Sequence, residues 1–414
     1  MSDHYDALET RDPELREHEQ LAQVRAQVAH AKAHAPGFAG LLRDIDPRAI
    51  VDRGSLAQLP LTRKSELVAL QQARRPFGGL AVGGWGDVAR VFASPSAIFE
   101  PEGRVADYWR FARALFAAGF RRGELVHNAF SYHFTPAGSM VEQGALALGC
   151  TVFPGGVAQT ELQVEVMAEL QPHGYAGTPS FLDIILERAD ALGKPVRSLR
   201  KALVSGEAFP AAMRERFAAR GIAACELYGT ADVGSIAYET SARAGLVVEE
   251  GVLVEIVRPG SGDPVGPGEI GEVVVTPLAN RDYPLIRFAT GDLSMVLDGP
   301  SPCGRTNLRL RGWLGRADQT TKVRGLFVHP SQVNAIVARH PEIRRARLVV
   351  DHDAGKDRMT LHVELEASAT ADPAAYTATI RQVTKLRGEV VCRGVDELPG
   401  DGKLVDDRRG VAVP

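Results

Sequence analysis

The sequence predicts an α/β protein with a large N-terminal α/β domain that contains a β-rich subdomain, followed by a small α+β C-terminal domain. Between residues 124 and 227, short apolar runs alternate with longer amphipathic stretches, a pattern typical of a largely parallel sheet covered by helices. After about residue 245, alternating Val, Leu and Ile segments broken by Gly and Pro indicate β structure. Residues 319–414 combine short apolar runs with a helical stretch at 374–386, which favours a separate α+β module.

The first clear element is a helix that begins at Asp12 and Pro13. Asp12 can accept hydrogen bonds from the first free N–H groups, and proline suits the first turn of a helix. Apolar residues then recur at helical spacing, at Leu21, Val24, Val28 and Ala31. We expect this face to pack on the main body, and the helix to end before Pro36.

The alternation between 124 and 227 resolves into individual elements. Strands are expected at 124–130, 150–153, 202–204 and 222–227, and helices at 138–148, 160–171, 180–192 and 210–220. Ligands of such sheets bind at the carboxyl ends of parallel strands. We therefore expect functional residues on the loops that follow these strands.

Composition excludes several partners. The chain has 414 residues and 48 Lys and Arg against 51 Asp and Glu, so its net charge of −3 offers no basic field for nucleic acid or an anionic membrane. No apolar run is long enough to span a bilayer, and the acidic start does not have the profile of a signal peptide. Four scattered cysteines without a CxxC pair fit a reducing compartment. We expect a cytoplasmic protein.

The loop after the strand at 222–227 carries the first candidate site. Tyr228, Gly229, Thr230 and Asp232 supply an aromatic face, a flexible backbone, a hydroxyl group and a carboxylate. Such a set can stack on a base, approach a phosphate closely and hold a divalent cation. An ordinary strand-to-loop turn explains the same residues.

Three further polar segments follow. Asp292 comes after Thr290 and Gly291, where a carboxylate can accept both hydroxyl groups of a ribose, although Thr-Gly-Asp is also a common turn. Residues 315–325 are charged and bounded by glycine, and a solvated connector between two domains would have the same composition. Lys403 follows a glycine on a flexible loop, from which its ammonium can reach a phosphate or simply face solvent.

The order of these motifs resembles that of the adenylate-forming acyl-CoA synthetase superfamily, and most of all its phenylacetate-CoA ligase branch. The motifs are Ser205-Gly206-Glu207, the 228–232 turn, Thr290-Gly291-Asp292, the segments 315–318 and 322–325, and Gly402-Lys403. Further matching segments lie at 61–67, 76–78, 177–180, 302–306 and 328–333. The resemblance covers nearly the whole chain.

The resemblance implies an enzyme that joins a carboxylic acid to ATP with Mg²⁺, giving an acyl adenylate and pyrophosphate. A rotation of a mobile C-terminal domain would then admit coenzyme A (CoA). The hinge would be Asp318, between a large domain at 1–317 and a small domain at 318–414. Lys403 would stabilise the charge that develops during adenylation, because a positioned cation helps most where charge accumulates. Asp232 would hold the metal.

The resemblance also assigns binding residues. Tyr228 would stack on adenine, and Asp292 and Arg316 would hold the ribose. The other nucleotide-binding residues would be Gly206, Glu207, Gly229 and Thr230, and the CoA passage would be lined by Lys322, Arg324 and Gly325.

The acyl pocket is expected near the densest aromatic cluster of a chain with 6% aromatic residues. Its members are Phe130, Tyr132, His133 and Phe134. A flat aromatic acid is the expected substrate, unless these rings are core. Relatives also suggest a homodimer.

One segment departs from the family pattern. Where the family has a Ser-, Thr- and Gly-rich loop ending in Lys around the β- and γ-phosphates, this chain has Ser94-Pro-Ser96-Ala-Ile-Phe-Glu100-Pro-Glu102-Gly103. Proline donates no N–H, the lysine is missing, and two carboxylates stand where a polyanion should lie. The metal motif also has an alanine in its hydroxyl position and Asp232 in place of the longer Glu, which weakens metal binding without abolishing it.

Three functions therefore stay open. In the first, ATP is still used, with hydroxyl contacts from Ser94, Ser96 and Thr230 and with Mg²⁺ offsetting the acids. In the second, the chain moves an acyl group between CoA and another thiol, such as that of an acyl carrier protein, without nucleotide. In the third, it keeps the fold as a catalytically silent binding protein.

Overall fold

The computed structural model describes residues 3–94, 98–319, 321–323, 326–353, 356–366 and 369–409. The chain divides into two compact units. The larger consists of Met1–Thr290 and Ser294–Trp313, and the smaller of Gly291–Leu293 and Leu314–Pro414. This division groups residues 314–317 with the smaller unit, and the hinge at Asp318 stays a prediction.

The N-terminal region is helical, as its first motif predicts. Asp12 caps α1 (Pro13–His34), and its carboxylate accepts hydrogen bonds from the N–H groups of Glu14 and Leu15. The predicted apolar stripe from Leu21 to Ala31 is buried. Pro36 does more than end this helix, because it also begins α2 (Pro36–Leu41). The other helices of this region are η1 (Ala7–Thr10), η2 (Pro47–Ala49), α3 (Arg53–Ala57), η3 (Lys64–Glu66) and α4 (Leu67–Ala73).

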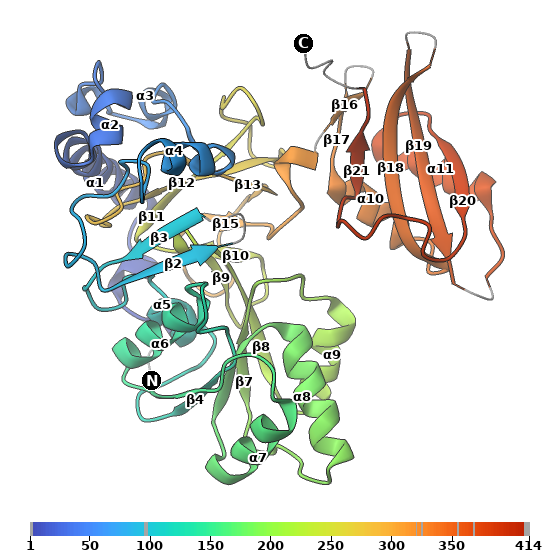
Figure 1. The fold of residues 1–414 in the computed structure, drawn as a ribbon, viewed down its shortest axis with the longest axis horizontal. Helices are drawn as coiled ribbons and strands as arrows, with labels where there is room; N and C mark the ends of the chain where they lie inside the picture. The colour runs from blue at the N-terminus through green and yellow to red at the C-terminus, as the bar shows by residue number, and fades with distance from the viewer. Residues whose placement is uncertain are drawn as a thin grey trace. The chain divides into compact units, whose positions relative to one another are not determined.

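Among the described residues, a nine-stranded sheet of order β14-β15-β10-β9-β8-β7-β6-β4-β5 forms the centre of the larger unit (Figure 1). Its parallel strands are β4 (Leu125–Asn128), β5 (Thr151–Pro154), β6 (Gly174–Gly177), β7 (Lys201–Val204) and β8 (Ala223–Thr230). Its antiparallel strands are β9 (Gly234–Glu239), β10 (Leu246–Val248), β14 (Val296–Leu297) and β15 (Arg309–Leu310). The predicted α/β class is confirmed.

Helices cover both faces of the parallel strands (Figure 1). One face is covered by α5 (Ala112–Ala117) and α6 (Ala137–Leu148), and the other by α7 (Thr160–Leu170), α8 (Pro179–Ala191) and α9 (Ala211–Ala219). Successive strand residues point to opposite faces. Leu203 therefore joins the core under α5 and α6, whereas Ala202 and Val204 join the core under α7 to α9. Because both of its faces are buried, β7 appears in the sequence as a continuous apolar run.

Sequence analysis misses β6, which has glycine at both ends. A Cβ atom on Gly174 would lie 2.3 Å from the Phe120 ring, so this ring fills the space that a side chain would need. Because β6 contains no β-branched residue and has glycine at both ends, its sequence does not indicate a strand.

A second sheet in the described chain has the order β1-β13-β12-β11. Its strands are β1 (Thr62–Arg63), β11 (Val252–Val257), β12 (Gly271–Pro277) and β13 (Phe288–Ser294). The antiparallel pair β11 and β12 is the β structure expected after residue 245. Thr62 pairs in parallel with Phe288, which brings the start of the chain to this sheet. A separate antiparallel hairpin consists of β2 (Arg90–Ser94) and β3 (Ile98–Glu102).

The smaller unit is an α+β module built around a sheet of order β20-β19-β18-β21. Its strands are β18 (Ile343–Asp353), β19 (Lys356–Leu365), β20 (Glu389–Arg393) and β21 (Val405–Asp407), and its helices α10 (Pro330–Val337) and α11 (Pro373–Thr384). A short hairpin, β16 (Thr321–Val323) and β17 (Leu326–Val328), follows η4 (Ala317–Gln319). The strands and the helix that the sequence predicts in this module are confirmed.

The cysteines are free thiols, as their scattered positions suggest. Burial raises the pKa of the Cys225 thiol to about 12, so this side chain acts as a small core residue at neutral pH. In the part of the chain that the structure describes, no helix is both long enough and apolar enough to cross a membrane.

Candidate active site

The loops after β4, β7 and β8 meet at one edge of the parallel strands, as the sequence predicts. Gly206, after β7, has a φ of +87°, a conformation that favours glycine. A Cβ atom at this position would lie 3.9 Å from the ring of Phe130, which follows β4. The Ser205 hydroxyl donates a 2.7 Å hydrogen bond to the Leu227 carbonyl on β8. These contacts bring the buried Phe130 ring and the loop at Gly206 next to the 228–232 turn.

Glu207 binds the start of α8. Its Oε1 atom accepts a 2.7 Å hydrogen bond from the N–H of Ser180, in the first turn of that helix. The free N–H groups and dipole at a helix N-terminus favour a carboxylate there. The 206–207 loop is therefore fixed by a partner that sequence analysis did not identify, although it singled out both Glu207 and the segment 177–180.

The Tyr228 ring is held in one orientation. Its hydroxyl group lies 3.3 Å from Oγ1 of Thr290, and the Thr290 hydroxyl donates a 3.0 Å hydrogen bond to the Val273 carbonyl. Both side chains are buried. A ring fixed in this way is a preorganised surface on which a flat base can stack.

The turn after Tyr228 depends on close backbone contact. A Cβ atom on Gly229 would lie 2.5 Å from the Gly234 carbonyl oxygen, so only glycine fits. Thr230 accepts a 3.2 Å hydrogen bond from the N–H of Val233 and thereby closes the turn. Gly229 and Thr230 thus shape this loop, and their contact with a nucleotide stays a prediction.

Asp232 is an acid with a built-in counter-ion. Its side chain has no exposed surface, and its Oδ2 atom lies 2.6 Å from Nζ of Lys64. Its Oδ1 atom has no hydrogen-bond partner in the described residues. Sequence analysis matched the segment 61–67 to the family pattern but did not identify Lys64 as a site residue, because the two residues are distant in the sequence.

The hairpin of β2 and β3 contains the segment that the sequence comparison with the family matched to the phosphate-binding loop. Ser94 donates a hydrogen bond to Oε1 of Glu100, and both side chains are buried. Glu102 is also buried, and its Oε2 atom accepts hydrogen bonds from Trp109 Nε1 at 2.8 Å and from Ser139 Oγ at 2.6 Å. The expectation of two carboxylates facing the phosphates is therefore wrong for Glu102, which is a core residue. Ser96 lies outside the described residues.

Glu100 shares its surroundings with Asp232. Burial, together with the nearby charge of Asp232, raises the pKa of the Glu100 carboxyl group to about 8, against the opposing effects of Ser94 and Lys64. Two carboxylates and one ammonium group therefore lie together in a largely buried environment. Because Asp232 offsets the charge of Lys64, this arrangement provides no net positive charge for a bare polyphosphate.

The aromatic segment after β4 is divided between core and surface. Phe130 is buried beside Gly206, and the Tyr132 hydroxyl accepts a 2.8 Å hydrogen bond from Asn128. His133 is exposed, and Phe134 is 80% exposed with a φ of +61°. The structure thus brings Phe130 to the candidate site, and the pocket roles of the other three residues stay predictions.

Two predicted ribose ligands meet within the smaller unit. Arg316 Nη1 lies 3.1 Å from Asp292 Oδ1, and the two residues form an isolated antiparallel bridge. Gly291 has a φ of +78°, and a Cβ atom there would lie 2.6 Å from Arg316 Nη2. The backbone conformation therefore favours glycine at this position, next to the paired carboxylate and guanidinium.

The remaining predicted residues also belong to the smaller unit. Lys403 is exposed on the loop before β21, and its N–H donates a 3.1 Å hydrogen bond to Asp401. Asp318 lies in η4 and Lys322 in β16. Arg324 and Gly325 lie outside the described residues, so their predicted contact with CoA stays a prediction.

Comparison with known proteins identifies the class. Residues 106–277 match the family model described as AMP-binding enzyme. The chain is 31% identical over 365 residues to phenylacetate-coenzyme A ligase of Thermus thermophilus, covering 84% of this chain and 80% of that protein. It is also 31% identical over 367 residues to the enzyme of the same name from Aromatoleum evansii, covering 84% and 82%. The fold is that of a 2-hydroxyisobutyryl-CoA ligase solved with 2-HIB-AMP and CoA, at a TM-score of 0.85, 24% identity, and coverage of 98% of this chain and 95% of that one.

The class of protein is thus an adenylate-forming enzyme, with a large α/β unit and a small C-terminal module. More specifically, the chain belongs to the phenylacetate-CoA ligase family. The resemblance that the ordered motifs suggest is confirmed, and the chain is an enzyme of the acid–thiol ligase kind.

Proposed function

We propose that this enzyme activates an aromatic carboxylic acid with Mg·ATP and transfers the acyl group to CoA. The observation that carries the proposal is the meeting of Tyr228, Gly206 and Phe130 at one sheet edge. The fixed phenol ring of Tyr228 suits a base, and the buried Phe130 ring next to the Gly206 loop suits a flat acid.

In the first step, a carboxylate oxygen bonds to the α-phosphorus of ATP while the bond to the bridging oxygen breaks and pyrophosphate leaves. In the second, the CoA sulfur bonds to the acyl carbon, its proton is lost, and AMP leaves. Lys403 would stabilise the charge on the α-phosphate during the first step. Lys322, Arg324 and Gly325 would guide CoA after a rotation about Asp318.

The residues present fit the two halves of the nucleotide unequally. Tyr228 and the carboxylate of Asp292 suit adenine and ribose. The sequence offers the triphosphate no glycine-rich loop, so binding of the phosphates depends on a cation near Asp232. Oδ1 of Asp232, which has no hydrogen-bond partner in the described residues, is a suitable ligand for such a cation. Mg²⁺, when bound there, would neutralise phosphate charge. The homodimer and the cytoplasmic location also stay predictions.

The test of this function is acid-dependent exchange of labelled pyrophosphate into ATP. Purified enzyme with Mg·ATP and a panel of aryl acids is expected to give exchange with at least one acid, and AMP and acyl-CoA once CoA is added. No exchange with any acid, together with no ATP binding by calorimetry, would rule out adenylation.

Replacing Asp292 with alanine is expected to weaken AMP binding about tenfold, because the ribose loses a charged acceptor. Isothermal titration calorimetry with AMP measures this change. Asp298→Ala, which removes an exposed aspartate, is the matched control and should bind AMP as the wild type does. Equal affinity in both variants would remove Asp292 from the nucleotide site.

A second function is favoured by the buried acids at Glu100 and Asp232, which oppose a polyanion. In it, the acyl group moves between CoA and another thiol, such as that of an acyl carrier protein, without ATP. Loss of acyl-CoA on addition of a carrier thiol, in the absence of nucleotide, would support this function.

A further inference from the structure

We propose that Asp401 and Gln319 are positioning residues for Lys403, because their side chains fix the backbone from which this lysine presents its ammonium group. The inference rests on the proposed role of Lys403 in adenylation and names two further residues on which that role depends. All three residues belong to the smaller unit.

Two side chains hold consecutive backbone N–H groups at the lysine. The Asp401 carboxylate accepts a 3.1 Å hydrogen bond from the N–H of Lys403. The side-chain carbonyl oxygen of Gln319 accepts a 2.9 Å hydrogen bond from the N–H of Leu404. Lys403 is exposed and follows Gly402, whose φ of +74° favours glycine. Exposed loops move more easily than the elements they connect, so hydrogen bonds to this backbone decide where the lysine lies.

Asp401 is itself fixed by the sheet of the smaller unit. The same oxygen atom that binds the Lys403 N–H also accepts a hydrogen bond from Arg347 on β18. Arg347 is 4% exposed, so its guanidinium group has little freedom to move. Arg347 and Arg345 also donate hydrogen bonds of 3.2 and 2.9 Å to the Pro399 carbonyl. These contacts anchor the loop to one strand just before Lys403.

Gln319 connects the lysine to the segment that follows the predicted hinge at Asp318. It lies in η4, whereas Leu404 directly precedes β21. This contact is not isolated, because the hydroxyl group of Thr321 on β16 donates a hydrogen bond to Asp407 on β21. The two segments therefore meet at two places. A rotation about Asp318 would move the lysine and the segment after the hinge as one body.

Position matters for an ammonium group that acts on a transition state. It lowers the barrier only where negative charge develops, on the α-phosphate and on the attacking carboxylate oxygen. A misplacement of about 1 Å can cost about a hundredfold in rate. The lysine side chain is long and flexible, so a fixed backbone is needed to limit the positions that its ammonium group can take. Loss of either contact is therefore expected to slow adenylation although the ammonium group is still present.

The experiment compares acid-dependent pyrophosphate exchange with acyl transfer from a preformed acyl adenylate to CoA. Asp401→Ala and Gln319→Ala are each expected to lower the exchange rate at saturating ATP and acid about tenfold or more, with an unchanged KM for ATP. Acyl transfer and the melting temperature should stay close to those of the wild type. Asp401→Asn and Gln319→Glu each keep an acceptor oxygen and should recover most of the lost rate.

The matched control is Asp351→Ala, which removes a carboxylate 2.9 Å from Arg358 in the same unit and should exchange pyrophosphate as the wild type does. A second readout does not depend on activity. Hydrogen–deuterium exchange, measured at single residues by mass spectrometry, should become about tenfold faster at the Lys403 amide in Asp401→Ala and at the Leu404 amide in Gln319→Ala, because each amide loses its hydrogen-bond partner.

Undiminished pyrophosphate exchange in either alanine variant, or an equal loss of exchange and acyl transfer, would overturn the proposal. The same conclusion would follow if Asp401→Asn and Gln319→Glu were no faster than their alanine counterparts, because the acceptor oxygen would then have no effect. Faster amide exchange in the variants of a protein that gives no pyrophosphate exchange with any acid would support the positioning contacts and count against the proposed function alone.

Discussion

Replacing Lys403 with alanine is expected to lower acid-dependent pyrophosphate exchange about a hundred- to a thousandfold, the usual effect of removing one group that stabilises transition-state charge. Negative charge gathers on the α-phosphate and on the attacking carboxylate oxygen as they approach. An ammonium group placed at that point offsets this charge without further reorganisation. The measurement is the initial exchange rate at saturating acid and ATP.

The fold is expected to tolerate this change. Lys403 is exposed, and its loop is held by other groups, since Asp401 binds both the Lys403 N–H and the buried Arg347. The melting temperature of Lys403→Ala should therefore equal that of the wild type. Lys194→Ala, which removes an exposed lysine 3.4 Å from Glu165, is the matched control.

A second readout separates a catalytic role from a structural one. Transfer of the acyl group from a preformed acyl adenylate to CoA needs no attack on the α-phosphorus, so Lys403→Ala should perform it at a rate close to that of the wild type. Equal loss of both reactions would mean that Lys403 has a structural role in the smaller unit and no specific role in adenylation. Undiminished exchange would remove Lys403 from the chemistry.

Much of the fold can be predicted from the sequence because local rules and tertiary burial agree. The capping residue Asp12 and the apolar stripe of α1 describe the same helix, and that helix forms. The runs that become β7 and β8 are apolar because helices cover both of their faces. Topology then places the loops at Gly206 and Tyr228 on one edge.

The partners of the site acids could not be predicted, because they depend on contacts between distant segments. Lys64 reaches Asp232 across 168 positions of sequence. Glu100 and Glu102 look equivalent in the sequence, since they flank Pro101 on one strand. Only the packing of Trp109 and Ser139 makes Glu102 structural and leaves Glu100 with an orphaned oxygen.

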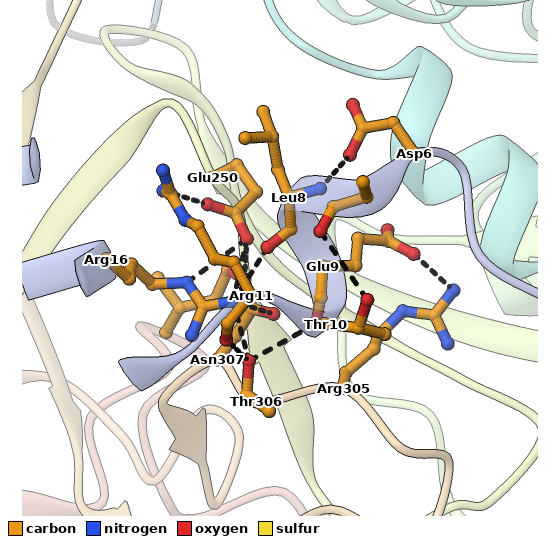
Figure 2. Close-up of polar contacts among 12 residues, drawn as sticks. Asp6, Leu8, Glu9, Thr10, Arg11, Arg16, Glu250, Arg305, Thr306 and Asn307 are labelled. Atoms are coloured by element: carbon orange, nitrogen blue, oxygen red, sulfur yellow. Dashed lines mark hydrogen bonds and ion pairs between the residues drawn. The ribbon is translucent and has the colours of Figure 1, made fainter. Parts of the chain in front are cut away.

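The burial and ion pairs of the charged N-terminal segment also could not be predicted from the sequence. Sequence analysis notes only that this start is acidic, whereas Glu9 in η1 is fully buried and paired with arginine side chains. Figure 2 shows the Glu9 carboxylate pointing toward Arg305, with Arg16 and Glu250 paired nearby. Pairing across nearly 300 positions leaves no local pattern in the sequence.

Replacing Glu9 with alanine is therefore expected to lower the free energy of unfolding of the larger unit by about 3–5 kcal/mol, the cost of removing one partner from a buried ion pair. Glu9 lies 2.9 Å from Arg305 and 3.3 Å from Arg113, and it accepts a 2.8 Å hydrogen bond from the Tyr238 hydroxyl group. Arg113 keeps Asp6 as a partner, so the main cost comes from the buried guanidinium of Arg305. Urea unfolding followed by tryptophan fluorescence measures the change.

The matched control is Glu19→Ala, because Glu19 also pairs with an arginine but is 44% exposed, and such a pair contributes less than about 1 kcal/mol. The double variant Glu9→Ala with Arg305→Met tests the cause of the loss. If the uncompensated charge of Arg305 is the main cost, removing that charge as well should restore part of the lost stability, since an apolar side chain replaces an unpaired buried cation. A further loss in the double variant would instead mean that Arg305 stabilises the unit through contacts that do not involve Glu9, such as its 3.0 Å hydrogen bond to the Asp3 carbonyl.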